Sequence, residues 1–474
     1  MKMTKIICTL GPASSDEKVI AKMLKNGMNV ARFNFSHGTH EYHKEMIDTF
    51  RKVRDELGVP AAVMLDTKGP EIRLKSFINK SVMLYSGDNY TLTTRDVEGD
   101  EKSVSITYKD LPEQLIKGDR VLIDDGRVEL SVVDTTDKDI YCKVVVGGVI
   151  SDKKGVNIPG KHLDFPYISK QDEEDLIFGV EQNVDFIAAS FVRSKDDVIA
   201  IRNLLDYHGG HNIKVISKIE NIEGVENFDE ILKHSDGIMI ARGDMGVEIE
   251  YEKLPGLQKS FIKKCYKAGK MVITATQMLE SMIHNSTPTR AEITDVANAV
   301  FDGTSAVMLS GETAMGDHPE LAVSVMAKIV CQAETDAFSM NTYENVAYEN
   351  DVNDTANAIC DAACTTARDV NAAAIIAVTM TGFTARRVSK FRPHEVIVAA
   401  TPDEQTFHQL ALSWGVFPVR ALLQNNSEAL FKHAIACAKK DGFVNKGDRV
   451  VITAGNGGMT NVLRVEVVSD YNKI

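Results

Sequence analysis

Short apolar runs alternate with amphipathic segments along the first two thirds of the chain. Each run is continuously apolar, which is typical of a parallel β-strand covered on both faces. The expected strands lie at residues 5–10, 29–35, 61–66, 185–190, 213–220, 236–241, 271–276 and 305–310.

The segments between these strands have helical periodicity. In residues 14–27, Ser15 is the expected N-cap, acidic residues occupy the first turn, and Lys25 and Gly27 mark the end. A further helical run follows the eighth strand at 319–334. Eight strands with helical crossovers predict an α/β protein with a (β/α)8 TIM barrel.

The spacing breaks once, between the third and fourth strands. Residues 70–166 contain turn signals such as SGDN, KGDR and DDGR between short β-rich runs. We interpret them as a small β-barrel domain inserted at the carboxyl end of the third strand. Barrel enzymes place their chemistry at that end, so the insertion can act as a lid.

A separate α/β unit follows residue 345, with five further strand candidates. It is either a module for dimerisation and stability or an anion site, because TMTGFTARRVSKF runs from a strand through a Thr/Gly loop into a basic helix. The expected domains are the barrel (1–69 and 167–345), the lid (70–166) and a C-terminal regulatory or oligomerisation domain (346–474).

Composition narrows the class of protein. The 474 residues are 44% hydrophobic and carry a net charge of -13 without a basic block, which argues against nucleic acid as the main partner.

No window approaches the roughly 18 apolar residues of a membrane span, and the N-terminal apolar run is too short for a signal peptide. Seven cysteines fit a reducing cytoplasm. Cys360 and Cys364 are four apart, but no His or acidic partner completes a metal site.

Polar side chains gather at the carboxyl ends of the expected barrel strands, where they would converge on one mouth. In chain order these are Arg32 with Asn34 and Ser36, Asp66 with Thr67, Ser190, Lys218 with Glu220, Asp244, Thr276, and Ser310 with Glu312.

Lys218 and Glu220 are two residues apart, so on a strand they point to the same side. An isolated pair of this kind is more often a structural ion pair. Asp244 follows one strand later, between Gly243 and Gly246, and two carboxylates without His or Cys suit magnesium completed by substrate oxygens. Lys218 would then face a bound anion.

NFSHG at 34–38 and LDTKGPEIR at 65–73 bring oxygen ligands beside Arg32 and Arg73. That chemistry fits a monovalent cation next to phosphate, while His37 is either a packing or cap residue or a direct ligand. The residues alone therefore predict a phosphoryl or enolate site under a lid.

Seven motifs in this order resemble the pyruvate kinase family over essentially the whole chain. They are NVARFNFSHG, MLDTKGPEIR, KKGVNIPG, ISKIEN, ARGDMGVE, TATQMLESM and MLSGETAMG. The resemblance implies phosphoryl transfer from phosphoenolpyruvate to ADP, giving pyruvate and ATP at the last step of glycolysis, with Mg²⁺ (or Mn²⁺) and K⁺.

The resemblance also implies roles for individual residues. Lys218 neutralises the phosphoryl group in flight, and Thr276 helps to deliver a proton to the enolate. The implied ligand sets are Arg32, Lys218, Gly243, Asp244 and Thr276 for phosphoenolpyruvate; Asn34, His37, Arg73 and Lys154 for the nucleotide; Glu220 and Asp244 for Mg²⁺; and Asn34, Ser36, Asp66 and Thr67 for K⁺. Glu71 implies that activity requires K⁺, since members independent of K⁺ have lysine there.

The C-terminal domain resembles the regulatory domain of the family. TMTGFTARRVSKFRP places a phosphorylated effector at Thr379, Thr381, Gly382 and Thr384, although TAGNGGMTN is shorter and less basic than the late loop of members using fructose 1,6-bisphosphate. The family is usually a homotetramer. Two other functions stay open: a magnesium-dependent barrel lyase or aldolase, and an inactive sugar-phosphate sensor.

Overall fold

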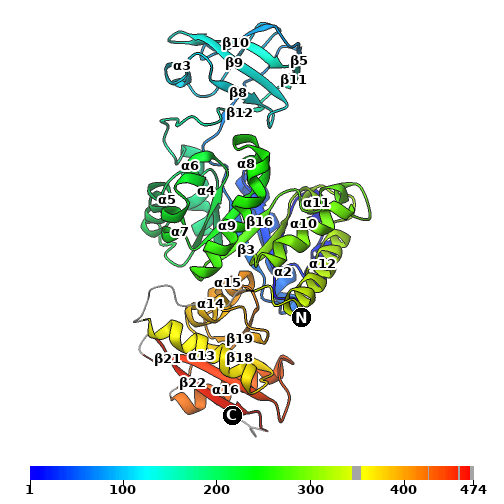
Figure 1. Ribbon diagram of the computed structural model, residues 1–474, viewed down its shortest axis with the longest axis vertical. Helices are drawn as coiled ribbons and strands as arrows, with labels where there is room; N and C mark the ends of the chain where they lie inside the picture. Colours follow the sequence, from blue (N-terminus) through cyan, green and yellow to red (C-terminus); the bar gives the residue numbers. More distant parts are fainter. Residues whose placement is uncertain (344–353, 425, 457–458, 470–474) are drawn as a thin grey trace.

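A computed structural model describes residues 1–343, 354–424, 426–456 and 459–469. The expected domain boundary at 345–346 and positions 457–458 of the late loop lie outside these residues. Figure 1 shows three units stacked along the long axis, with the inserted domain at one end, the barrel in the middle and the C-terminal domain at the other end.

Eight parallel strands close the central barrel, which confirms the predicted fold class. Around the barrel they are β1 (Lys5–Thr9), β2 (Val30–Asn34), β3 (Ala62–Asp66), β13 (Phe186–Ala189), β14 (Lys214–Ile219), β15 (Gly237–Ala241), β16 (Met271–Ala275) and β17 (Ala306–Leu309). Because β13 pairs directly with β3, the insertion leaves the barrel intact.

Helices surround the strands. They are α1 (Glu17–Lys25), α2 (His40–Leu57), α4 (Lys170–Glu181), α5 (Lys195–Tyr207), α6 (Ile222–Glu226), α7 (Phe228–His234), α8 (Arg242–Glu248), α9 (Leu254–Lys267), α10 (Arg290–Phe301), α11 (Gly311–Ala314) and α12 (Pro319–Ser339), with short 3-10 turns η1 (Pro12–Ser14), η2 (Tyr251–Lys253) and η3 (Glu280–Ile283). One hydrophobic core lies between strands and helices, and a second fills the barrel interior.

The first helix begins one residue later than predicted. Asp16, not Ser15, is the N-cap of α1, because its carboxylate accepts from the backbone N–H of Lys18 at 2.8 Å and of Val19 at 3.3 Å. Ser15 instead donates its hydroxyl to the carbonyl of Pro12 in the preceding turn. Both are N-cap residue types, so the residue type did not distinguish them.

The inserted segment is a β domain with its own core. Its strands pair as a seven-stranded sheet in the order β4, β12, β8, β9, β10, β6, β7, and as a two-stranded sheet of β11 and β5. The two edges of the larger sheet are joined where the Thr107 N–H donates to the Arg73 carbonyl at 2.9 Å and Leu74 pairs with Ile106, as in the predicted small β-barrel. The strand bounds are β4 (Ile72–Arg73), β5 (Ser81–Leu84), β6 (Asn89–Thr93), β7 (Ser103–Ser105), β8 (Arg120–Ile123), β9 (Val128–Thr135), β10 (Asp139–Val146), β11 (Gly148–Ser151) and β12 (Gly155–Asn157), with one short helix, α3 (Leu111–Gln114).

The C-terminal domain is a five-stranded sheet in the order β20, β19, β18, β21, β22, with a hydrophobic core on each face. The elements are α13 (Thr355–Asp369), β18 (Ala374–Val378), α14 (Phe383–Lys390), β19 (Val396–Thr401), α15 (Glu404–Gln409), η4 (Leu410–Leu412), β20 (Val416–Arg420), α16 (Ser427–Lys440), β21 (Arg449–Asn456) and β22 (Met459–Val467). Among the described helices, none is long and apolar enough to span a membrane.

Candidate active site

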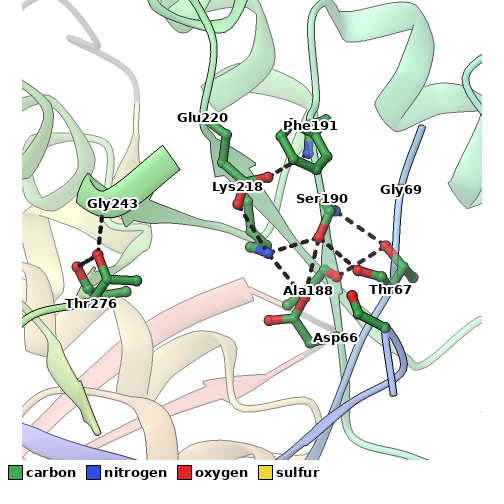
Figure 2. A network of polar contacts seen from close by, with 12 residues as sticks. Asp66, Thr67, Gly69, Ala188, Ser190, Phe191, Lys218, Glu220, Gly243 and Thr276 are labelled. Carbon is green, nitrogen blue, oxygen red and sulfur yellow. Dashed lines mark hydrogen bonds and ion pairs between the residues drawn. The ribbon is translucent and has the colours of Figure 1, made fainter. Parts of the chain in front are cut away.

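Four side chains from neighbouring barrel strands meet at the carboxyl ends, and Figure 2 shows three of them, Asp66, Ser190 and Lys218. Asp66, fully buried at the end of β3, accepts from Arg32 Nε at 2.6 Å and from Lys218 Nζ at 3.0 Å. Ser190 Oγ donates to Asp66 Oδ1 at 3.2 Å and accepts from Lys218 Nζ at 2.7 Å. Two cationic side chains are therefore held around one carboxylate.

Glu220 lies on the other side of the lysine. Its Oε1 is 3.0 Å from Lys218 Nζ, so the two side chains share one side of β14 as the sequence predicted. Its Oε2 accepts from the backbone N–H of Phe191 at 2.6 Å, and Phe191 has a left-handed φ of 54°. A strained backbone thus presents its N–H to the carboxylate.

Burial and neighbouring charges govern ionisation here. Burial alone would lower the pKa of Lys218, but Asp66 and Glu220 outweigh it and raise that pKa above its ordinary value. Burial raises the pKa of Asp66, but Arg32 and Lys218 reverse the effect and hold it below the usual range. Burial raises the pKa of Glu220, Asp244 adds to this and Lys218 opposes it.

The repulsion between Glu220 and Asp244 fits a divalent cation. Because Asp244 raises the pKa of Glu220, a cation held between the two carboxylates would favour the ionised form of Glu220. In the described part of the chain, no group of three or more His, Cys, Asp or Glu side chains is arranged to hold a metal. The repulsion between Glu220 and Asp244 is the observation that fits magnesium held by two carboxylates and completed by ligand oxygens.

The oxygen-rich segments on β2 and β3 are adjacent. Asn34 is paired in register with Asp66, and Asn34 Oδ1 accepts from the backbone N–H of Ser36 at 3.2 Å. The Thr67 carbonyl accepts from Ser190 Oγ at 2.7 Å. The Asn34 amide, the Asp66 carboxylate and the Thr67 carbonyl therefore come from adjacent ends of β2 and β3, and oxygen ligands of these kinds fit a monovalent cation.

A cavity of about 440 Å³ separates the barrel mouth from the inserted domain, within the usual size of ligand pockets. His37, Arg73, Lys154 and Asp244 all line it. Lys154 Nζ lies 2.7 Å from Asp124, and Arg73 donates from Nε to Glu71 at 2.5 Å.

His37 does not cap α2, because Thr39 is the N-cap of that helix. Its side chain is exposed on the cavity, which leaves it accessible to a ligand.

Thr276 lies on the opposite side of the mouth. Its φ is 65°, and its Oγ1 accepts from the backbone N–H of Gly243 in the first turn of α8 at 2.8 Å. Arg242 holds this strained segment by donating to the Thr276 carbonyl at 2.6 Å. These contacts thus hold the Thr276 backbone, and with it the hydroxyl at the mouth, in a conformation that an isolated peptide would avoid.

The expected effector residues are separate from this site, in the C-terminal domain. Gly382 precedes α14 with a φ of 78°, and a Cβ there would lie 2.5 Å from Arg386 Nη1. The hydroxyls of Thr384 and Thr460 lie 2.7 Å apart, and the Thr381 carbonyl accepts from Arg386 at 2.9 Å.

Sequence reasoning missed Asp125, which lines the cavity in the inserted domain. Burial and Asp244 raise the pKa of Asp125, so the lid contributes an acid close to the barrel carboxylates. Asp124 and Asp125 both have left-handed φ values, of 53° and 56°. The sequence analysis interpreted the DDGR stretch only as a turn. In the structure, both aspartates of that turn line the cavity.

Fixed cations, paired carboxylates and a cavity under an inserted domain define a barrel enzyme that stabilises a phosphoryl-type anion. Comparison with known proteins makes the class specific. Residues 1–323 match the family model for the pyruvate kinase barrel domain and residues 357–466 match that for the pyruvate kinase alpha/beta domain. The chain is 47% identical to pyruvate kinases of Staphylococcus haemolyticus and Staphylococcus aureus, over 99% of its own length and 81% of theirs. The chain belongs to the pyruvate kinase family and is a phosphotransferase.

Proposed function

We propose that this chain transfers the phosphoryl group of phosphoenolpyruvate to ADP, giving pyruvate and ATP. The observation that carries the proposal is Lys218, held by Asp66, Glu220 and Ser190 at the barrel mouth. A cation fixed in this way stabilises charge on a migrating phosphoryl group without reorganising during the reaction.

Each side of the mouth has a role in this proposal. Arg32, Gly243, Asp244 and Thr276 bind phosphoenolpyruvate, and the Thr276 hydroxyl helps to deliver a proton to the enolate carbon. Asn34, His37, Arg73 and Lys154 bind the nucleotide, and the last two come from the inserted domain and its connection to the barrel. Closure of that domain would exclude water that would otherwise accept the phosphoryl group.

Two cations complete the proposed site. Magnesium or manganese held by Glu220 and Asp244 would supply positive charge to the phosphoryl oxygens. Potassium would be held by Asn34, Ser36, Asp66 and Thr67, and Glu71 supports a requirement for it.

The test is pyruvate formation from phosphoenolpyruvate and ADP with magnesium, in chloride salts of potassium, sodium or choline. We expect rapid turnover only with potassium, and a loss of at least about 10²-fold in kcat for Lys218→Met. Lys214→Met, at the other end of β14, is the matched control and should keep its activity.

Absence of turnover in every salt, from a folded protein, would reject the proposed reaction. Full activity of Lys218→Met would reject the role of the lysine, and full turnover in choline would reject the potassium site.

Four further features belong to the proposal. A phosphorylated effector binds at Thr379, Thr381, Gly382 and Thr384. The chain forms a homotetramer with the C-terminal domain in one interface. A monomeric mass by light scattering would reject the tetramer. The seven cysteines, all of them free, support a cytoplasmic location. The domains divide at 69–70, 166–167 and 345–346.

A further inference from the structure

His43 is a buried histidine near the start of α2 that has no part in the function proposed above. It is 4% exposed, and its Nε2 lies 2.7 Å from the carbonyl oxygen of His37. Because a carbonyl oxygen only accepts, Nε2 carries the proton of this hydrogen bond. The ring therefore reaches from the helix to residues 34–38, the segment that holds proposed ligands of the nucleotide and of potassium.

The other ring nitrogen of His43, Nδ1, is buried and has no hydrogen-bond partner among the described residues. Burial lowers the pKa of His43, so the ring is neutral at neutral pH and Nδ1 is an acceptor. A buried acceptor without a donor costs free energy, and phenylalanine would fill the same space without that cost. The cost is explained if the proton on Nε2 is needed by the His37 carbonyl.

The segment 34–38 fits closely against this ring. The rings of Phe35 and His43 stack with their centroids 4.0 Å apart and an interplanar angle of 12°. Gly38 has a left-handed φ of 85°, and a Cβ there would lie only 3.1 Å from His43 Nε2. His43 therefore lies against the segment both before and after His37.

We propose that His43 is a positioning residue for the nucleotide side of the site. Its Nε2–H fixes the His37 carbonyl, and with it the direction in which the His37 side chain meets the nucleotide phosphates. His37 is exposed on the cavity, whereas His43 is not among the described residues of the lining, so His43 acts through His37. The inference rests on the proposed function, because it requires ADP as the ligand of His37.

Two variants separate the N–H donor from the ring. His43→Phe keeps a ring to stack on Phe35 but removes the donor, and His43→Gln keeps an N–H donor without the ring. ADP is titrated calorimetrically into the full-length protein with magnesium and potassium, without phosphoenolpyruvate. We expect the Kd for ADP to rise at least about fivefold in His43→Phe, as for the loss of one hydrogen bond. His43→Gln should bind ADP more tightly than His43→Phe.

A double-mutant cycle shows whether the effect passes through His37. His37→Ala should weaken ADP binding by itself. In that background, His43→Phe should change the Kd by less than about twofold, because no His37 side chain is left to direct.

Steady-state kinetics distinguish positioning from a general loss of stability. His43→Phe should raise the KM for ADP by a factor similar to that in Kd, while kcat and the KM for phosphoenolpyruvate stay within about twofold of the wild type. The control is His408→Phe in α15, which also replaces a histidine that is 4% exposed and has no described partner at Nδ1. This variant should lower Tm and keep both KM values.

Three results would overturn the inference. They are unchanged ADP binding by folded His43→Phe, an equal effect of His43→Phe with and without His37→Ala, and an equal rise in both KM values. If the wild type neither binds ADP nor forms pyruvate, the proposed function itself fails and the inference fails with it. Binding and turnover by the wild type, with an unaffected His43→Phe protein, would reject only the role of His43.

Discussion

Asp185 is a buried carboxyl group immediately before β13, 4% exposed, and it accepts from the backbone N–H of Val63 at 2.7 Å. Burial raises its pKa to about 7, and the nearby Arg51 and Arg54 oppose this only in part. The folded protein therefore holds a proton that the unfolded chain releases near pH 4. The stability that this proton contributes is complete below that pH and is lost as the pH rises through about 7.

Asp185→Asn should remove this dependence, because the amide keeps an acceptor for Val63 without ionising. The wild type loses stability from pH 5 to pH 8 and the variant does not. The free energy of unfolding of the variant, relative to that of the wild type, should therefore rise by on the order of 2 kcal/mol over this range. Thermal unfolding at pH 5, 6.5 and 8 measures the difference. A constant difference in Tm across this range would show that Asp185 does not titrate there.

At the same scale, the sequence predicted which side chains meet at the barrel mouth but not how they are paired. The two-residue spacing of Lys218 and Glu220 was sufficient, because strand geometry alone places them on one side. The spacing could not indicate that Asp66 binds both Arg32 and Lys218, since three separate strands bring these groups together. Ser190 was recognised as a polar strand end, yet its contacts to Asp66 and Lys218 needed the structure.

At the scale of single elements, the corrected N-cap of α1 gives a matched pair of variants. Asp16→Ala removes the acceptor for the N–H groups of Lys18 and Val19 and should cost about 1 kcal/mol. Ser15→Ala removes only a hydrogen bond within η1 and should stay within about 0.5 kcal/mol of the wild type. Shifts in Tm rank the two, and a larger loss for Ser15→Ala would return the cap to that residue.

All eight barrel strands were predictable because each is buried on both faces and therefore continuously apolar. The N-cap was harder, since Ser15 and Asp16 are adjacent and both suit the position. The strand order of the inserted domain could not be predicted from the sequence. Its sheet pairs β12 with both β4 and β8, and those pairings depend on contacts between distant residues that short β-runs do not specify.

At the scale of the whole molecule, Leu412 connects the C-terminal domain to the barrel. It belongs to η4, it is fully buried, and it forms part of the hydrophobic core inside the barrel together with Ile7 and Phe186. The sequence analysis made no prediction for Leu412, because a local apolar pattern does not show that a residue belongs to the core of another domain. The same segment is fixed by Gln409, which donates to the carbonyls of Asp185 at 3.2 Å and Asn212 at 2.8 Å.

Leu412→Ala should therefore destabilise the barrel itself, although the substitution lies in the C-terminal domain. Truncating a buried leucine costs about 2–5 kcal/mol, depending on how far the cavity collapses. Leu422→Ala, at a leucine that is 71% exposed, is the control and should change stability by less than about 0.5 kcal/mol. Thermal unfolding followed by loss of pyruvate formation reports on the barrel, and equal midpoints for the two variants would mean that the two domains unfold independently. A lower midpoint for Leu412→Ala alone would mean that the barrel needs the C-terminal domain to complete its core. A structural change in the C-terminal domain could then alter the stability of the barrel through this residue.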